Sequence, residues 1–278
     1  MVDTLYDKLL ILKEKDAGGN VIERERRTTV NHAMKTCRRA WNVATRRNPG
    51  KIPAVNPFAS MGLQSSDRET PTATFAELQS FRAKAKELGF PSLATAALIG
   101  WEWLQRETDI FATFEVAHYR PKERPNAVRV LHEKTREENW IPLFDEKGVP
   151  LYPELMLELD ALKRERIAGL MLRRDSGERA PWPTWPSPDS PDLTHMSRKT
   201  KEIVRAAKLR DVLTFTSFRH GGFTEAADSD LSDAEIRAQG RHKSARVLPR
   251  YAKRTMKQIT TGAKKRREQR ETKPEEAE

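Results

Sequence analysis

The chain has 278 residues, with 51 Lys and Arg against 40 Asp and Glu, which gives a formal net charge of +11 at neutral pH. Its length allows one or two domains, and a hydrophobic fraction of 37% is too high for a disordered chain. No apolar run approaches the roughly 18 residues of a membrane-spanning helix, and the N-terminus carries no secretory signal pattern. Cys37 is the only cysteine, which excludes an intramolecular disulfide and a cysteine-based zinc site and favours a reducing cytoplasm.

The positive charge is concentrated in two segments. Residues 241–270 hold twelve Lys and Arg and one acidic residue, and residues 21–60 hold nine Lys and Arg and two acidic residues. Residues 61–240 have a net charge of −3. Two basic segments around a near-neutral middle are typical of a protein that clamps a polyanion. A solvated basic helix followed by a flexible tail would give the same composition.

In the first quarter of the chain, apolar spacing predicts a helix over residues 4–15, ended by the turn signal DAGGN. A second helix is expected over residues 27–46, with Thr28 or Thr29 as its N-cap. The Pro-, Gly- and Ser-rich stretch at residues 48–72 is predicted to be an interdomain linker.

The rest of the chain is predicted to be mostly α-helical with one small antiparallel sheet, an α+β arrangement. A capping box between Thr74 and Glu77 begins the first helix, and the second is apolar nearly all round. Residues 181–192 contain five prolines and are expected to form a loop. Helices are expected over residues 74–88, 92–106, 153–166, 194–209, 218–227, 232–239 and 247–257, and the strands of a hairpin over residues 127–132 and 139–143.

Five residues in a fixed order could carry chemistry. Taken singly, each has an ordinary interpretation: a cation at a helix end, a solvated turn residue, a surface residue, a half-buried histidine or a packed tyrosine. The spacing of the last three favours reading them together. The five are Arg106 in LQRETD (with Asp109 three residues later), Lys134 in HEKTREENW, Arg219 in FTSFRHGGF, His242 in QGRHKS, and Tyr251 in RVLPRYAKRT.

This order resembles the tyrosine recombinase (phage integrase) family. The match is closest over residues 215–255, where an arginine–histidine pair precedes a Gly-x-His turn and then a tyrosine nine residues after the histidine. Stretches such as RTTVNHAMKTCRRAW and HYRPKERPNAVR look like prophage integrases. The resemblance implies four segments: a partial helical core-binding domain at residues 1–58, a linker at 59–73, a catalytic domain at 74–265 and a charged tail at 266–278.

The resemblance implies site-specific DNA recombination by strand cleavage and rejoining. Tyr251 would form a covalent 3′-phosphotyrosyl link, and Arg106 and Arg219 would donate hydrogen bonds to the phosphate oxygens. His242 would add another donor, and Lys134 would protonate the leaving 5′-oxygen. The arginines supply the positive charge for this chemistry, so we expect neither a metal ion nor a cofactor.

Two features depart from the family pattern. A histidine or lysine usually lies three residues before the second arginine, where this chain has Thr216. A threonine cannot act as a general base at neutral pH, although its hydroxyl can bind a phosphate oxygen. About 70 residues precede the catalytic segment, so the core-binding domain is expected to be shortened. One alternative is therefore a truncated or inactive prophage-derived remnant that only binds DNA, and a weaker one is a type IB topoisomerase.

The resemblance also implies partners. Double-stranded DNA attachment sites are the expected ligand, together with a host protein that bends DNA, in the bacterial cytoplasm at the nucleoid. A homotetramer on DNA is expected to form through the C-terminal segment at residues 256–278, with no membrane partner. The cations predicted to contact DNA are Arg38, Arg39, Arg46, Arg47, Lys243, Arg246, Arg250, Lys253 and Arg254.

Overall fold

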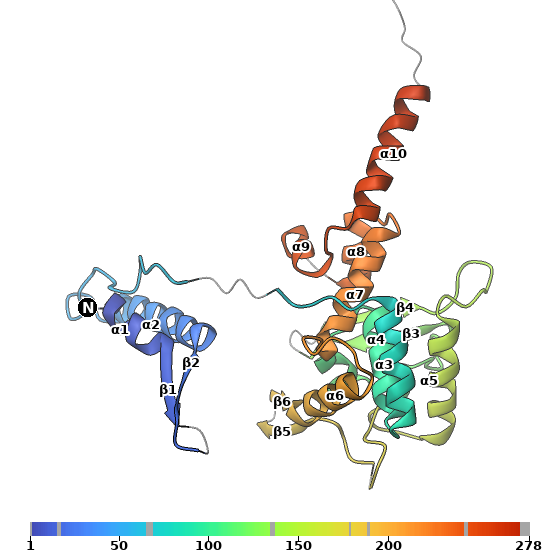
Figure 1. The fold of residues 1–278 in the computed structure, drawn as a ribbon, viewed down its shortest axis with the longest axis horizontal. Coiled ribbons are helices and arrows are strands. Elements are labelled where there is room, and N and C mark those ends of the chain that lie inside the picture. Colours follow the sequence, from blue (N-terminus) through green and yellow to red (C-terminus); the bar gives the residue numbers. More distant parts are fainter. Residues whose placement is uncertain are drawn as a thin grey trace, which may run out of the picture. The chain divides into compact units, whose positions relative to one another are not determined.

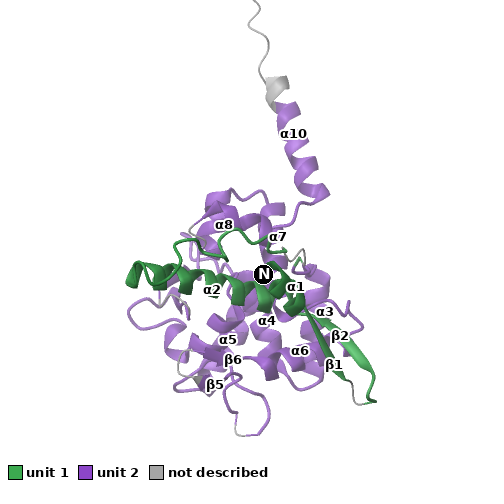
Figure 2. Ribbon diagram, turned by 90° about the vertical axis from the view of Figure 1, so that its left-hand side faces the viewer, with its two compact units in different colours: residues 1–69 green, residues 70–278 purple. Residues whose placement is uncertain are grey.

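The computed structural model describes residues 2–15, 18–64, 69–133, 137–177, 179–187, 190–241 and 244–272. The chain divides into two compact units, Met1–Glu69 and Thr70–Glu278, which are coloured green and purple in Figure 2. Within the described ranges, no helix combines the length and the apolar character needed to cross a lipid bilayer.

Unit 1 consists of two helices and a hairpin: α1 (Val2–Leu10), β1 (Ile11–Lys15), β2 (Val21–Glu25) and α2 (Arg27–Arg47). Its small core contains Tyr6, Leu10, Val30 and Met34. The prediction of one helix over residues 4–15 is wrong beyond Leu10, because the chain then pairs antiparallel with β2. Both strands are mostly exposed, so no alternation of apolar and polar residues marked them in the sequence.

The segment after α2 packs against that helix as far as Gln64. The Trp41 indole N–H donates to the carbonyl of Pro53 at 3.1 Å, and Arg38 Nε donates to the carbonyl of Phe58 at 2.7 Å. Much of the stretch expected to be a linker therefore belongs to unit 1. The expected N-cap is also wrong: Arg26 precedes α2 and makes no side-chain cap.

Unit 2 has the predicted fold class, mostly α-helical with small antiparallel sheets (Figure 1). The predicted capping box of Thr74 and Glu77 is present, with both hydrogen bonds made. The elements are α3 (Phe75–Glu87), α4 (Pro91–Glu102), β3 (Ala127–Leu131), β4 (Glu138–Pro142), α5 (Pro153–Glu165), β5 (Thr184–Ser187), β6 (Ser190–Asp192), α6 (Thr194–Ala206), α7 (Phe215–Asp228), α8 (Asp233–Gly240), α9 (Leu248–Tyr251) and α10 (Met256–Thr272).

Three local predictions in unit 2 are corrected. Helix α4 ends at Glu102, so Arg106 lies in the following loop, just before the helical turn at residues 107–113, rather than at the C-terminal end of α4. The segment 181–192 includes the short β5–β6 hairpin, and Trp182 is buried, with its indole N–H donating to Ser92 Oγ at 2.9 Å. The helix expected over 247–257 is interrupted after Tyr251, and α10 extends through the expected tail to Thr272.

The break after α9 has a tertiary cause. Ala252 is extended, and the backbone N–H of Lys253 donates to Thr224 Oγ1 on α7 at 3.1 Å. Thr255 and Gln258 both donate to Asp228, the last residue of α7. These contacts with α7 replace the hydrogen bonds that a continuous helix would make.

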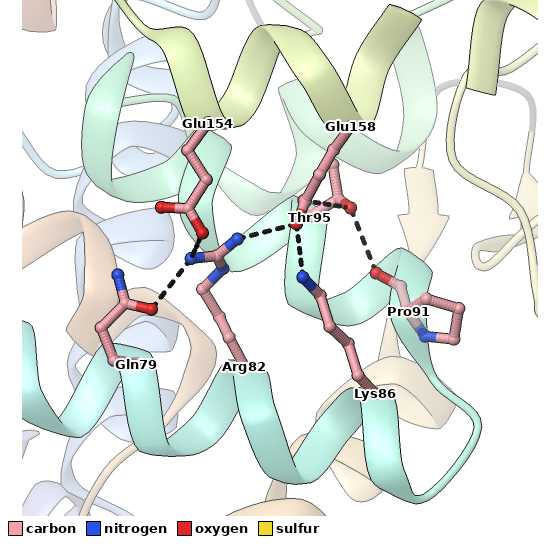
Figure 3. Close-up of polar contacts among 7 residues, drawn as sticks. All are labelled: Gln79, Arg82, Lys86, Pro91, Thr95, Glu154 and Glu158. Atoms are coloured by element: carbon pink, nitrogen blue, oxygen red, sulfur yellow. Dashed lines mark hydrogen bonds and ion pairs between the residues drawn. The ribbon is translucent and has the colours of Figure 1, made fainter. Parts of the chain in front are cut away.

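A buried arginine holds α3, α4 and α5 together (Figure 3). The side chain of Arg82 is 2% exposed and donates to Glu154 at 2.7 Å and to Glu158 at 2.8 Å. Lys86 and Thr95 also donate to the Glu158 carboxylate, at 2.6 and 2.7 Å. Because a buried charge without partners is very costly, this network fixes the three helices in register.

The backbone of helix α7 packs directly against Trp101 near the end of α4. A Cβ added to Gly222 would lie 2.2 Å from the carbonyl oxygen of Trp101, and one added to Gly221 would lie 2.0 Å from the Trp101 ring. The Trp101 indole N–H donates to Glu225 at 2.6 Å on the same side. Only glycine permits this approach, which sets the position of the preceding residue pair, Arg219 and His220.

We predict that Gly222→Ala lowers the free energy of unfolding of unit 2 by about 1–3 kcal/mol, because the added methyl meets backbone rather than a movable side chain. Urea unfolding followed by tryptophan fluorescence measures the loss. Gly262→Ala is the matched control, since nothing lies within 4 Å of its Cβ position in α10. Equal stability of Gly222→Ala and wild type would contradict the packing described here.

Candidate active site

Arg219 contacts three separate elements from its position in the first half of α7. It is 4% exposed. Its Nη1 donates to the carbonyl of Leu104 in the loop after α4, and its Nη2 donates to the carbonyl of Gly240 at the end of α8 at 3.5 Å. The guanidinium carbon lies 5.3 Å from the centre of the Tyr251 ring. Burial, and then the charge of Arg106, lowers the pKa of Arg219 to about 9, so it remains a cation at neutral pH.

The loop that receives Arg219 has a strained backbone. Leu104 has a φ of 54°, in the left-handed region that is costly for a leucine. Its side chain is buried with Phe223, Ile236 and Leu248, while its carbonyl accepts the bond from Arg219. Packing and the charged hydrogen bond together hold this conformation, which determines where Arg106 emerges two residues later.

Tyr251 lies at the end of the one-turn helix α9, against α7. Its ring stacks on His220 with 4.7 Å between ring centroids and packs on Phe223 at 4.9 Å. Leu248, one turn earlier, is buried and anchors α9. The tyrosine is half-buried, and it faces an arginine of its own chain.

Asp109 connects the Arg106 loop with the end of β3. Its Oδ2 lies 3.6 Å from Arg106 Nη1 and 3.9 Å from Nε2 of His132. Its Oδ1 accepts a hydrogen bond from the backbone N–H of Glu133 at 3.0 Å. The side chain is 2% exposed, so this buried carboxylate orients Arg106 and fixes the start of the turn that follows β3.

Thr216 lies three residues before Arg219 on α7. Its hydroxyl donates to Glu107 Oε2 at 3.3 Å. Burial raises the pKa of Glu107, although the bond from Thr216 acts in the opposite direction. The position at which the resemblance predicts a histidine or lysine is thus filled by a threonine paired with a carboxyl group.

Three predicted site residues, Lys134, His242 and Lys243, lie outside the described residues. Of the other predicted DNA contacts, Arg38 is half-buried and bonded to Phe58, as noted above, and Lys253 is half-buried. The remaining cations are exposed: Arg39, Arg46 and Arg47 on α2, Arg250 on α9, and Arg246 and Arg254 on either side of α9.

Sequence reasoning missed three residues beside this site: Glu107, His220 and Arg241. Arg241 follows α8 with φ 56° and ψ 48°, and burial, with a further contribution from Arg106, lowers its pKa to about 10 although Asp109 opposes the shift. A bulky residue in QGRHKS, where a helix ends and glycine would be favoured, was the available signal. Among the side chains that the structure describes, no group of three or more His, Cys, Asp or Glu could hold a metal ion.

No protein-family model and no curated protein matches the sequence. Solved structures do match. A lambda integrase dimer bound to a COC′ core site aligns with a TM-score of 0.60 at 17% identity, over 81% of this chain and 59% of that one. The Tn1549 transposon integrase in complex with transposon right end DNA aligns at 0.58 with 13% identity, over 86% and 79%. XerA recombinase aligns at 0.53 with 10% identity, over 88% and 77%.

The chain has the tyrosine recombinase fold. The resemblance predicted from the residue order is therefore confirmed at the level of architecture. The chain spans about three fifths of the length of the lambda integrase chain in the first of these complexes.

Within this tyrosine recombinase fold, His220 predicts a pH dependence of stability. Burial, and then the charge of Arg219, lowers its pKa from 6.5 to about 4. Between these values the unfolded chain binds the proton more tightly, so the free energy of unfolding should fall as pH decreases from 6.5 to 4, by up to about 3 kcal/mol.

Urea unfolding of wild type and His220→Phe across this pH range isolates the contribution of His220, because phenylalanine keeps the stack on Tyr251. We expect the variant to lose less stability on acidification than wild type. Identical pH profiles would show that His220 does not carry this dependence.

Proposed function

We propose that the protein catalyses site-specific DNA recombination by cleaving and rejoining strands through a covalent 3′-phosphotyrosyl intermediate at Tyr251. The observation that carries this proposal is the placement of the Tyr251 ring against the buried Arg219 guanidinium, with Arg106 held nearby by Asp109. A phenol beside fixed guanidinium groups is the arrangement that transesterification at a phosphodiester requires.

In the proposed step, the Tyr251 phenol gives its proton to a water molecule, its oxygen attacks phosphorus, and the bond from phosphorus to the 5′-oxygen breaks. Arg106 and Arg219 donate hydrogen bonds to the non-bridging oxygens, where negative charge develops in the transition state. The 5′-oxygen leaves as a hydroxyl after receiving a proton, which we assign to Lys134, and His242 adds a donor to the phosphate. Attack by a 5′-hydroxyl on the phosphotyrosine reverses the step and rejoins the strand.

The other tyrosines of the chain are poor candidates for the nucleophile. The hydroxyl of Tyr6 donates to Asn31 in unit 1, and that of Tyr119 donates to the carbonyl of Met156 in the core. Burial raises the pKa of Tyr119, and it raises the pKa of Tyr152 to about 12. Both shifts disfavour the phenolate that attacks phosphorus, which supports Tyr251.

DNA binding and assembly are proposed on two grounds. The structural neighbours include lambda integrase as a dimer on a core site and as a tetramer on a Holliday junction. In this chain, α10 carries the exposed apolar side chains of Met256 and Ile259, which are 75% and 62% exposed. We propose that double-stranded DNA is the substrate and that α10, with the residues after it, binds a neighbouring protomer.

The second candidate is a remnant that binds DNA without cleaving it. The pairing of Thr216 with Glu107 favours it, because neither a histidine nor a lysine occupies that position. The two candidates differ in whether the wild-type chain forms any covalent adduct with DNA. Relaxation of supercoils without site preference would instead favour a type IB topoisomerase.

We predict that wild type forms a covalent adduct with a nicked suicide substrate and that Tyr251→Phe abolishes it, since phenylalanine lacks the attacking oxygen while keeping the ring packing. Denaturing gel electrophoresis with labelled DNA measures the adduct. Tyr152→Phe is the matched control and should form it at the wild-type rate. An adduct formed by Tyr251→Phe would overturn the assignment, and no adduct from wild type would favour the DNA-binding remnant.

DNA affinity should fall steeply with salt. If the basic segments neutralise about six phosphates, the slope of log K against log salt concentration should be roughly −5. Fluorescence anisotropy of a labelled duplex over a salt series measures this slope. An affinity that does not change from low to moderate salt would contradict both the recombinase and the DNA-binding remnant.

A further inference from the structure

Arg241 is a buried guanidinium whose terminal nitrogens have no partner. Within the part of the chain that the structure describes, Nη1 and Nη2 are both inaccessible to solvent and make no hydrogen bond. Guanidinium groups rarely remain buried in this state, because desolvation of a charge without compensating bonds is costly. A pair of free, parallel N–H donors is suited to bind two oxygens of one anion.

The charges around Arg241 are predominantly positive. The charge of Arg106 lowers the pKa of both Arg219 and Arg241, and the charge of Arg241 also lowers the pKa of Arg219. Asp109 opposes the lowering of the pKa for both Arg219 and Arg241, and its Oδ2 lies 3.6 Å from Arg106 Nη1. Three guanidinium groups around one carboxylate leave an excess of positive charge, which an anion would neutralise.

The backbone at Arg241 adds an independent observation. The residue closes α8 in the left-handed conformation, with φ 56° and ψ 48°. Glycine adopts this conformation at a helix end without strain, whereas arginine does not. Arg219 fixes the preceding residue by its bond to the Gly240 carbonyl. Strained side-chain-bearing residues of this kind cluster at functional sites.

We propose that Arg241, whose terminal nitrogens are covered in the free chain, is uncovered when DNA binds and acts as a third phosphate-binding residue, donating to a non-bridging oxygen of the scissile phosphate beside Arg106 and Arg219. This inference rests on the proposed function, because the anion is taken to be a DNA phosphodiester. The hydrogen bond from Arg219 to the Gly240 carbonyl holds α7 against the end of α8, which carries Arg241. In this proposal Arg241 contacts the reacting phosphate directly.

The first experiment compares two suicide substrates. On the ordinary phosphodiester, Arg241→Gln should slow adduct formation by on the order of 10²-fold, the typical effect of losing one donor to a developing oxyanion. On a substrate with a methylphosphonate at the scissile position, one charged oxygen is absent, so the gap between Arg241→Gln and wild type should shrink to less than about tenfold. Arg237→Gln is the matched control. It removes a positive charge from α8, the helix that Arg241 follows, where Arg237 Nε donates to the Asp233 carbonyl one turn earlier.

The second experiment does not require cleavage. Thermal unfolding of the full chain is followed across a titration of inorganic phosphate at constant ionic strength. Wild type and Arg237→Gln should gain stability with phosphate, and Arg241→Gln should lose most of that gain. Arg241→Gly should also lose the stabilisation by phosphate. Glycine suits the left-handed backbone at this position, so this variant is expected to fold, and its loss of stabilisation would report the loss of the anion site.

The outcomes distinguish the two proposals. If wild type forms no adduct but Arg241→Gln loses the phosphate-dependent gain, the recombinase assignment fails and the anion site stands. The inference is overturned if wild type forms the adduct and Arg241→Gln slows adduct formation by the same factor on both substrates. It is also overturned if Arg241→Gln is stabilised by phosphate as much as wild type, because Arg241 then does not bind the anion.

Discussion

The site depends on the burial of one positive charge. The Arg219 guanidinium is almost completely removed from water, and such a charge is tolerated only when hydrogen-bond acceptors and aromatic faces surround it. Leu104 supplies one carbonyl, Gly240 another, and Phe223 and Tyr251 supply ring faces. The loop after α4, the end of α8 and the short helix α9 must therefore converge on α7, which brings Tyr251 and the loop that carries Arg106 against Arg219.

This convergence is possible because α7 lacks side chains where it crosses α4. Gly221 and Gly222 allow the helix to meet the backbone of Trp101. Arg219, at the start of the same stretch, then donates to the Leu104 carbonyl in the loop after α4. At Thr95, nearer the start of α4, the network of Arg82 and Glu158 fixes the helix against α3 and α5. The site is thus held by a rigid helical layer, as the proposed phosphate-binding role requires.

Local signals in the sequence predicted much of this architecture. The capping box at Thr74, the amphipathic helix α2 and the β3–β4 hairpin depend on neighbouring residues, so their patterns were readable. The interruption between α9 and α10 was not, because it follows from hydrogen bonds between Lys253, Thr255 and distant residues of α7. The β1–β2 hairpin was not predicted because its strands are almost wholly exposed, so their sequences show no alternation of apolar and polar residues.

The same division applies to the candidate site. Arg106, Arg219 and Tyr251 could be predicted because their order and spacing match a family motif, and the structure brings Arg219 into contact with Tyr251 and places Arg106 nearby. Glu107, His220 and Arg241 could not, because their importance depends on which elements meet at Arg219. The net charge of +11, which first indicated only a polyanionic partner, now includes at least two buried guanidinium groups that solvent cannot screen.

The central claim is that Tyr251, placed by the buried Arg219, is the residue that attacks DNA. Its most direct test is mass spectrometry of the peptides from a nuclease-trimmed protein–DNA adduct. The account predicts that a nucleotide joined through its 3′-phosphate is found on the peptide containing Tyr251 and on no other peptide. A remnant on the peptides of Tyr6, Tyr119 or Tyr152, or on a residue other than tyrosine, would contradict it.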